Sequence, residues 1–445
     1  MSRRTAVIGA GPAGCYAAHL LQQQGREVVL YEQAKTVGGR TSSWHEQGWV
    51  VDSGAGFFTN FYPTLWALIT KLGLENEITN LSRSNALTDG EKVADFTLGS
   101  TASFANFTFL GTRAKLSMAM QTALIFAKYR HLDLSSAASL APFDDASVRD
   151  DAVKRVGERA YQYLVRPGIE PFWFFSCESI SRSLMLALQA KAATARFYTF
   201  RQGMNFVCTK LATSLDVRTG VTVDQIRPSG AQFKITGATL VDGPEHTFDE
   251  VIVATTASVA ARITAGLDER MVPDTVRTFL KTQTYVANTH LVFVADKGAK
   301  LPKMSCLLPC GPKDHRIAGL NFNSHKLQTR GVARRGQEAI SVYLTADESK
   351  ATLGMSESEL YSHAWRLARE LSPELPAYAE PLQMIQRRDA IPIHAVGRYR
   401  LAAEVGKRQK GPLVFAGDYL ATATVDGAMR SGFEAAHALD QRIAI

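Results

Sequence analysis

Three glycines near the start of the chain, Gly9, Gly11 and Gly14, have the spacing of a phosphate-binding turn. Gly9 permits a tight turn, Gly11 lets backbone N–H groups approach a pyrophosphate, and Gly14 lets a following helix pack against the preceding strand. An acidic residue, Glu32, follows about 20 residues after the turn, where it can accept hydrogen bonds from both ribose hydroxyls. These residue types predict a site for the pyrophosphate and ribose of a dinucleotide.

The segments around these residues are the ones that such a site requires. Residues 5–8 are an apolar run that predicts a strand, residues 15–24 have helical character, and residues 27–31 predict a second strand that ends at Glu32. The N-terminus of the helix would place its partial positive charge beside the pyrophosphate. The first domain is therefore expected to have a Rossmann-type α/β fold.

A second glycine segment favours FAD over NAD as the dinucleotide. Gly-Gly-Arg at positions 38–40 lets the chain pass close to a ligand and offers Arg40 to a diphosphate. The small residues at 53–56 suit a backbone that lies against a flat ring.

The last fifty residues supply the matching half of the same site. An apolar strand at 413–417 leads to Asp418, which can bind ribityl hydroxyls or reach the phosphate through water. A helix that opens near Val425 would direct its free N–H groups at the flavin pyrimidine, and its field would stabilise the reduced flavin.

These motifs resemble the flavin amine oxidase superfamily, which also contains protoporphyrinogen oxidases and carotenoid desaturases. The resemblance is specific at both ends, over 7–11 with 39–40 and over 415–418 with 427–428. It is weaker at 201–204 with 211–212, at the V-x-x-I motif of 223–226, and at 251–255. It implies non-covalent FAD, with adenine against the backbone of Val223, because no cysteine follows Cys310 to form the late linkage of some relatives.

The resemblance and the motifs together predict a set of cofactor-binding residues. These are Gly9, Gly11, Pro12, Ala13, Gly14, Glu32, Gln33, Gly39, Arg40, Gly54, Ala55, Val223, Gly417, Asp418, Val425 and Ala428. The family also implies a glutathione-reductase-like FAD domain interleaved with an α+β substrate domain. The expected FAD-domain segments are 1–59, 199–262 and 396–445, and the expected substrate-domain segments are a mostly helical 60–198 and 263–395.

Departures from the amine oxidase pattern bear on the substrate. That branch commonly places a lysine near flavin N5, but the best-matching strand, 286–293, contains none. The expected aromatic residue before the last helix is also missing from 421–424, where Tyr419 is the nearest one. The segments 163–169 and 171–175 instead resemble the protoporphyrinogen oxidase and desaturase branches.

Aromatic residues are the candidates for a substrate pocket, although each can equally pack a core. The predicted pocket residues are Phe57, Phe58, Trp173, Phe174, His394 and Tyr419. No catalytic dyad is expected, because a bound flavin would carry the chemistry at N5.

Three functions remain open at this point. The leading hypothesis is dehydrogenation of a bulky, largely apolar or heteroaromatic small molecule, with O2 as the expected electron acceptor. The second is an amine or amino-acid oxidase that produces an imine and hydrogen peroxide. The third is a flavin-dependent isomerase without net redox chemistry, or a flavin-bearing partner protein.

Composition limits the class of protein, its compartment and its partners. The 445 residues are 46% hydrophobic with a formal net charge of +8, which is typical of a folded enzyme. Five cysteines without CxxC spacing predict reduced thiols in a cytoplasmic protein, and no metal site or nucleic-acid partner is expected. Lys115, Lys128 and Arg130 bracket an apolar helical stretch, which is typical of a solvated helix or of weak peripheral contact with an anionic membrane. Nothing in the sequence indicates an oligomeric state.

Overall fold

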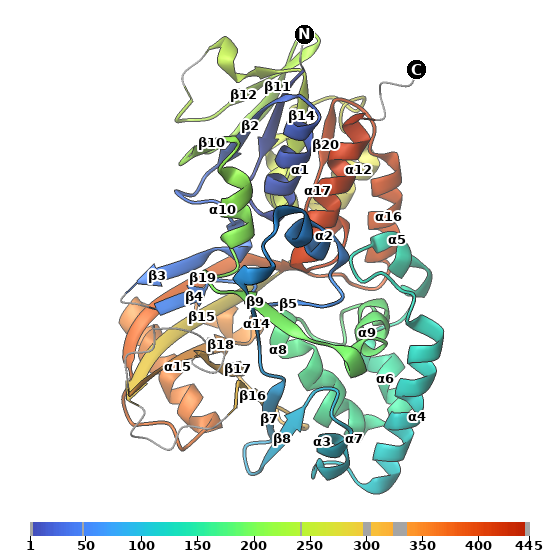
Figure 1. The fold of residues 1–445 in the computed structure, drawn as a ribbon, viewed down its shortest axis with the longest axis vertical. Coiled ribbons are helices and arrows are strands. Elements are labelled where there is room, and N and C mark those ends of the chain that lie inside the picture. The colour runs from blue at the N-terminus through green and yellow to red at the C-terminus, as the bar shows by residue number, and fades with distance from the viewer. Residues whose placement is uncertain (1–2, 47–48, 241–242, 297–303, 324–335, 441–445) are drawn as a thin grey trace.

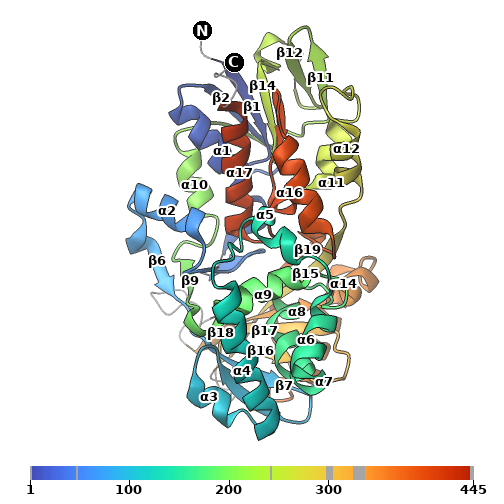
Figure 2. The ribbon, with the colours of Figure 1, turned by 90° about the vertical axis from the view of Figure 1, so that its right-hand side faces the viewer.

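The fold was obtained as a computed structural model, which describes all residues except 1–2, 47–48, 241–242, 297–303, 324–335 and 441–445. The chain folds into two parts that are stacked along the long axis of the molecule (Figure 1). Both termini lie at the end that contains the parallel sheet, and a larger mixed sheet with several helices forms the opposite end (Figures 1 and 2).

The first part is built on a five-stranded sheet whose pairings are all parallel. Its strands, in order across the sheet, are β10 (Asp216–Thr219), β2 (Glu27–Glu32), β1 (Arg4–Ile8), β14 (Glu250–Val253) and β20 (Leu413–Phe415). These strands come from three widely separated stretches of sequence. The predicted Rossmann-type α/β fold is confirmed.

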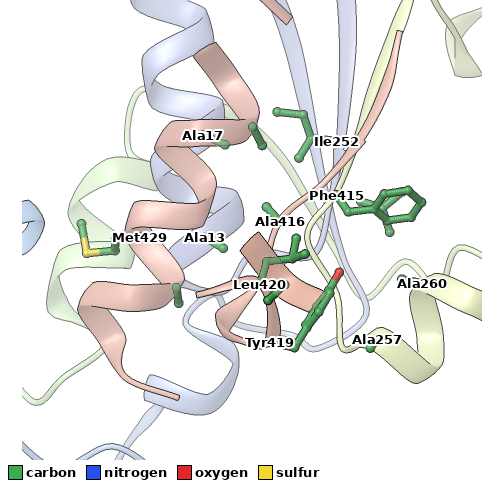
Figure 3. Packing of buried hydrophobic residues seen from close by; sticks show 14 of the residues in the cluster. Ala13, Ala17, Ile252, Ala257, Ala260, Phe415, Ala416, Tyr419, Leu420 and Met429 are labelled. Atoms are coloured by element: carbon green, nitrogen blue, oxygen red, sulfur yellow. The ribbon is translucent and has the colours of Figure 1, made fainter. Parts of the chain in front are cut away.

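Helices cover both sides of this sheet. They are α1 (Pro12–Gln23), α10 (Phe206–Ala212) and α17 (Val425–Asp440) on one side, and α11 (Ala257–Ile263) and α12 (Asp274–Lys281) on the other (Figure 2). Small residues let α1 and α17 pack closely: a Cβ on Gly432 would stand 2.2 Å from the Ala13 carbonyl oxygen. Figure 3 shows this core, in which Ala13 and Ala17 lie beside α17, close to Ala416 at the end of β20.

The V-x-x-I motif lies where a loop leads into a strand outside the parallel sheet. The strand that pairs with β2 is Asp216–Thr219. Residues 221–224 are a loop, and β11 (Gln225–Ser229) begins a separate antiparallel sheet with β12 (Gln232–Thr236) and β13 (Thr247–Phe248). Val223 therefore lies beyond the end of β10, where the loop faces the ends of the parallel strands.

The second part contains a seven-stranded mixed sheet. Its strands, in order, are β19 (Glu380–Pro392), β15 (Tyr285–Asp296), β18 (Gln337–Leu344), β17 (Ile317–Phe322), β16 (Cys306–Pro309), β7 (Ser84–Thr88) and β8 (Val93–Thr97). β7 and β8 come from the segment that was expected to be mostly helical, so that expectation was incomplete. β7 pairs in parallel with β16, a long-range pairing that no local pattern reveals.

Alternation along β15 gives the two faces of this sheet different partners. Leu291 and Phe293 pack under α15 (Glu357–Leu371), whereas Val292 packs against Trp49 of the hairpin β3 (Ser43–Glu46) and β4 (Trp49–Asp52). Asn288 is on the same side as Val292, because it lies an even number of residues away. This is the side that faces the cavity described below.

The remaining elements cover the second part and connect it to the first. The helices are α2 (Pro63–Leu72), α3 (Thr101–Asn106), α4 (Thr112–Tyr129), α5 (Ala137–Leu140), α6 (Val148–Val156), α7 (Glu158–Ala160), α8 (Glu170–Trp173), α9 (Arg182–Gln189), α14 (Ala346–Ala351) and α16 (Arg398–Arg408). A small sheet joins β5 (Phe58–Thr59), β9 (Phe197–Phe200) and β6 (Ile78–Asn80). Apolar spacing predicts one helix over 147–164, but the structure interrupts it at Gly157, whose φ of 84° ends α6.

Candidate cofactor and substrate site

One cavity of about 790 Å³ joins the two parts of the molecule. It begins at the carboxyl ends of the parallel strands, which is where ligands bind in open α/β sheets. Its lining residues there include Gly9, Gly11, Pro12, Ala13, Glu32, Gln33, Gly39, Arg40, Gly54, Ala55, Val223, Gly417, Asp418, Val425 and Ala428. The cavity then continues to the seven-stranded sheet, so a long ligand and a second molecule can share it.

The glycine turn has the shape that the spacing predicts. Gly9 has a φ of 103°, and a Cβ there would lie 2.6 Å from the Ala254 carbonyl oxygen. A Cβ on Gly14 would lie 1.8 Å from the Gly9 carbonyl oxygen, so Gly14 serves packing and does not line the cavity. Gly11 is different, because a Cβ there meets nothing within 4 Å. The open space at Gly11, beside the start of α1, leaves room for the pyrophosphate that the spacing predicts.

Glu32 is held rigidly at the end of β2. Its Oε2 accepts a hydrogen bond of 2.8 Å from the Ala10 N–H, and its Oε1 accepts one of 2.8 Å from the Ala34 N–H. A carboxylate has about four lone-pair positions. Two positions therefore remain open to further donors, and ribose binding by Glu32 stays a prediction.

Arg40 and Asp418 form a two-pronged ion pair in the half of the cavity at the ends of the parallel strands, which we call the cofactor groove. The Arg40 Nη1 and Nη2 atoms donate to the two carboxylate oxygens of Asp418, both at 2.8 Å. Burial alone would lower the pKa of Arg40, but the Asp418 carboxylate outweighs it and raises that pKa above its ordinary value. Much of the Arg40 charge is therefore balanced within the protein instead of being free for a diphosphate.

The first turn of α17 completes the flavin side of the groove. Val425 and Ala428 line it, and the Thr424 Oγ1 caps the helix by accepting from the Gly427 N–H at 2.9 Å. Asp426 in this turn is fully buried. Its carboxylate accepts hydrogen bonds from the Leu65 N–H at 2.7 Å and from the Ser135 hydroxyl. Burial raises the pKa of Asp426 to about 6.

Aromatic residues surround the other half of the cavity, which we call the substrate chamber. Its aromatic lining is Phe57, Tyr62, Phe172, Trp173, Phe174, Phe197 and Tyr343. The Trp173 Nε1–H donates to the Ala423 carbonyl at 2.8 Å, which ties the chamber wall to the loop before α17. Phe174 has a φ of 60° and is the only residue besides glycine in the described chain with a positive φ. Backbone strain of this kind is often found at functional sites.

Neutral polar side chains form the rest of the chamber wall. Asn85, Asn288, Ser305 and Asn321 line it from the strands of the seven-stranded sheet or their ends. The Asn288 Nδ2 and the Ser305 Oγ are buried and have no hydrogen-bond partner within the described chain. Because buried polar groups are normally paired, this unused capacity suits a polar group on a ligand.

Three predicted pocket residues do not line the cavity, and the prediction was wrong for them. Phe58 is fully buried, because its ring stacks on Phe200 at 5.0 Å between centroids. His394 is buried with its ring stacked on Tyr399 at 4.6 Å, and burial lowers its pKa to about 3, so it is a neutral core histidine at neutral pH. Tyr419 is also in the core, where its ring lies close to α11 (Figure 3).

The sequence reasoning also missed part of the site. Asn85, Asn288, Asn321 and Tyr343 gave no local signal, because each lies singly on a different strand. A charge run as short as Arg387-Arg388 is more typical of solvated surface than of a nucleic-acid patch, but Arg387 lines the cavity and donates to the carbonyl and the hydroxyl of Ser53. The only feature of the sequence that could have placed Arg387 near the cavity is its partner Ser53, which directly precedes the predicted cofactor residue Gly54.

The comparisons with known proteins fit this geometry. Residues 12–440 match the family model of flavin-containing amine oxidoreductases. The chain belongs to that family. A zeta-carotene desaturase of Capsicum annuum is 28% identical over 203 residues, which cover 43% of this chain and 34% of that protein. The chain thus matches about a third of the length of this relative.

Solved structures of the family share the whole fold. A protein provisionally described as a protoporphyrinogen oxidase, from an Exiguobacterium species, has a TM-score of 0.76 at 15% identity and covers 99% of both chains. Cyclohexylamine oxidase from Brevibacterium oxydans has a TM-score of 0.73 at 16% identity and covers 100% of both chains. At such low identity these likenesses establish the fold alone.

Family membership makes the chain an FAD-dependent oxidoreductase, and FAD is its cofactor. The groove fits that cofactor: Gly11 leaves open space for a pyrophosphate, Glu32 retains acceptors for a ribose, and the N-terminus of α17 lies at the far end. No group of three or more metal-ligating side chains occurs in the described part of the chain. Among the helices described, none is long and apolar enough to cross a membrane.

Proposed function

We propose that this flavin-containing amine oxidoreductase dehydrogenates a bulky, largely apolar or heteroaromatic molecule that carries one neutral polar group. The supporting observation is the composition of the substrate chamber, which combines an aromatic wall with unpaired amide and hydroxyl groups. When bound, FAD supplies the hydride acceptor at N5. The chain's own residues bind the substrate, orient its C–H bond and exclude water.

Charge in the cavity argues against an amine cation as the preferred substrate. Of the described lining residues, only Glu32, Asp389 and Asp418 are acidic. Glu32 is bound to backbone amides, Asp418 is paired with Arg40, and Asp389 accepts from a hydroxyl at 2.6 Å. Arg387 lines the same cavity, and no carboxylate is among the described aromatic and polar residues that form the wall of the substrate chamber, so a protonated amine would find no negative partner there.

We further propose that Asn288 binds the polar group of the substrate. Its backbone lies where the register between β15 and β19 shifts, and such irregularities commonly direct side chains into sites. Replacing the amide by an apolar group of similar size removes one neutral hydrogen bond, worth about 0.5–1.5 kcal/mol. The expected result is a loss of roughly two- to tenfold in kcat/KM.

The test is a substrate panel followed by anaerobic reduction of the bound flavin. Neutral dihydro-heteroaromatic compounds are expected to bleach the flavin absorbance faster than primary amines or amino acids. Asn288→Leu should slow this reduction without changing FAD content, whereas Asn288→Asp should improve binding of amines by adding a carboxylate. Asn60→Leu, an exposed position outside the lining, is the control.

Two outcomes would overturn the proposal. A primary amine as the best substrate, with imine and hydrogen peroxide as products, would identify an amine oxidase. Conversion of a substrate to an isomer, with no net change in flavin absorbance and no acceptor consumed, would identify an isomerase. A peroxide assay under air also tests whether O2 is the electron acceptor, as we propose.

A further inference from the structure

The helix α4 exposes an unusual amount of apolar surface. Leu116, Met120 and Leu124 are 67%, 58% and 56% exposed, and Phe126 is 43% exposed. Leu116, Met120 and Leu124 are four residues apart, so they form one stripe along the helix. These four residues are among only ten exposed large hydrophobic residues in the described chain. Contiguous patches of this kind usually mark an interaction surface.

Positive charge lies at both ends of the same helix. Arg113 and Lys115 are in its first turn, and Lys128 and Arg130 are at its end, with no acidic residue between them. None of the four forms an ion pair within the described residues. Lys115 donates to the Ala105 carbonyl, and Arg130 lies over the Phe126 ring at 5.8 Å. The exposed face of α4 therefore combines an apolar stripe with uncompensated cations.

The position of α4 leaves this face open to a flat surface. The helix packs on α6 and α9 through its other side, where Met118 and Ile125 are buried. It lies at the end of the molecule opposite the five-stranded sheet (Figures 1 and 2). The cofactor-binding part would thus point away from any surface that contacts this end.

We propose that the α4 face docks peripherally on an anionic membrane surface. The apolar stripe would enter the boundary between headgroups and acyl chains, while the cations would bind anionic lipid headgroups. The positive charge at both ends of α4 favours an anionic membrane over a neutral protein surface as its partner. The inference is independent of the proposed reaction, because it rests only on the surface of α4.

The test is flotation of the FAD-loaded protein with vesicles of phosphatidylcholine, with and without phosphatidylserine. Binding is expected with phosphatidylserine only, and added salt should weaken it. Arg113→Gln/Lys128→Gln/Arg130→Gln should weaken binding roughly a hundredfold, from the typical contribution of three cations near an anionic surface. A matched control, Lys210→Gln/Arg227→Gln/Lys407→Gln, removes three exposed cations elsewhere and should bind nearly as well as the parent protein.

The apolar stripe is tested separately with Leu116→Ser/Met120→Ser/Leu124→Ser, which should abolish flotation. Its control is Met355→Ser/Leu401→Ser, at positions that are 41% and 48% exposed on other helices or loops. Unchanged flavin content, melting temperature and turnover of a water-soluble substrate would show that the variants are folded.

Three results would overturn the inference: no flotation, equal flotation with both vesicle types, or equal losses in the variants and their controls. A fourth would be a dimer in light scattering that the Leu116→Ser/Met120→Ser/Leu124→Ser variant converts to a monomer. That result would assign the α4 face to a second copy of the chain.

Discussion

Replacing Arg40 is expected to weaken FAD binding through the carboxylate that it leaves behind. Arg40 donates to both oxygens of Asp418 at 2.8 Å and to the Ala390 carbonyl at 3.2 Å. In Arg40→Ala the Asp418 carboxylate loses the two hydrogen bonds that it accepts from Arg40, and its side chain is only 12% exposed. An unpaired negative charge would then stand beside the groove for a doubly charged diphosphate.

The magnitude follows from the geometry of the pair. A hydrogen bond to a charged group contributes about 1.5–3 kcal/mol, and breaking a fully buried ion pair costs about 3–5 kcal/mol. Because the Arg40 side chain is 29% exposed, water screens part of this cost. We expect the free energy of unfolding of the apoprotein to fall by about 2 kcal/mol. The unpaired Asp418 carboxylate would also repel the diphosphate, and a repulsion of about 2 kcal/mol corresponds to a roughly thirtyfold rise in the FAD dissociation constant.

The assay is a titration of apoprotein with FAD, followed by flavin fluorescence, together with urea unfolding of the apoprotein. Asp418→Asn alone should weaken FAD binding less than Arg40→Ala. The double variant Arg40→Ala/Asp418→Asn should recover a clear part of the affinity, because it removes the orphaned charge. If the double variant binds FAD no better than Arg40→Ala, Arg40 contacts the diphosphate directly and our reasoning is wrong.

Other predictions test the groove and its supports. Because burial raises the pKa of Asp426 to about 6, the native state retains a proton that the unfolded carboxyl loses above about pH 4. Stability should therefore fall as pH rises from about 4 to about 6, and Asp426→Asn should flatten that slope in urea unfolding; an unchanged slope would contradict this. Gly11→Ala should weaken FAD binding without lowering the melting temperature of the apoprotein, whereas Gly14→Ala should lower that temperature, because only its Cβ meets backbone, at 1.8 Å. Equal effects of the two variants would refute this assignment. Trp173→Phe keeps an aromatic ring but loses part of the indole and its 2.8 Å bond to the Ala423 carbonyl, so it should cost at least about 1 kcal/mol of unfolding free energy; no change would show that the bond is not stabilising.

Elements with strong local signals were predictable from the sequence. Apolar spacing near 3.6 residues predicts a helix over 63–72, and the structure has it as Pro63–Leu72, with proline at its start and Gly73 in the left-handed conformation at its end. A helix is also predicted near 357–371, and the structure has it as Glu357–Leu371, with a capping box at Ser356. The cofactor groove was predictable for the same reason, because its glycines and Glu32 lie within one local motif.

The substrate chamber was not predictable in the same way. Its polar wall takes Asn85, Asn288 and Asn321 from three strands that are not neighbours, and only the order of the strands in the seven-stranded sheet brings them to one cavity. Phe58 was wrongly predicted to line the pocket: it begins β5 and is buried in the core, whereas Phe57, just before the strand, lines the cavity. Sequence proximity to the flavin-facing glycines could not decide between the two.

The contact between the two parts of the molecule depends on an irregular stretch of β19. Between the pairs Val286–Ile391 and Asn288–Arg387, one residue of β15 faces three residues of β19. Side chains and backbone of this stretch contact the cofactor-binding part: the Arg387 guanidinium donates to the Ser53 carbonyl, and the Ala390 carbonyl accepts from Arg40. The same shift sets Asn288 at the chamber wall, so one local irregularity positions both the cofactor groove and the proposed substrate contact.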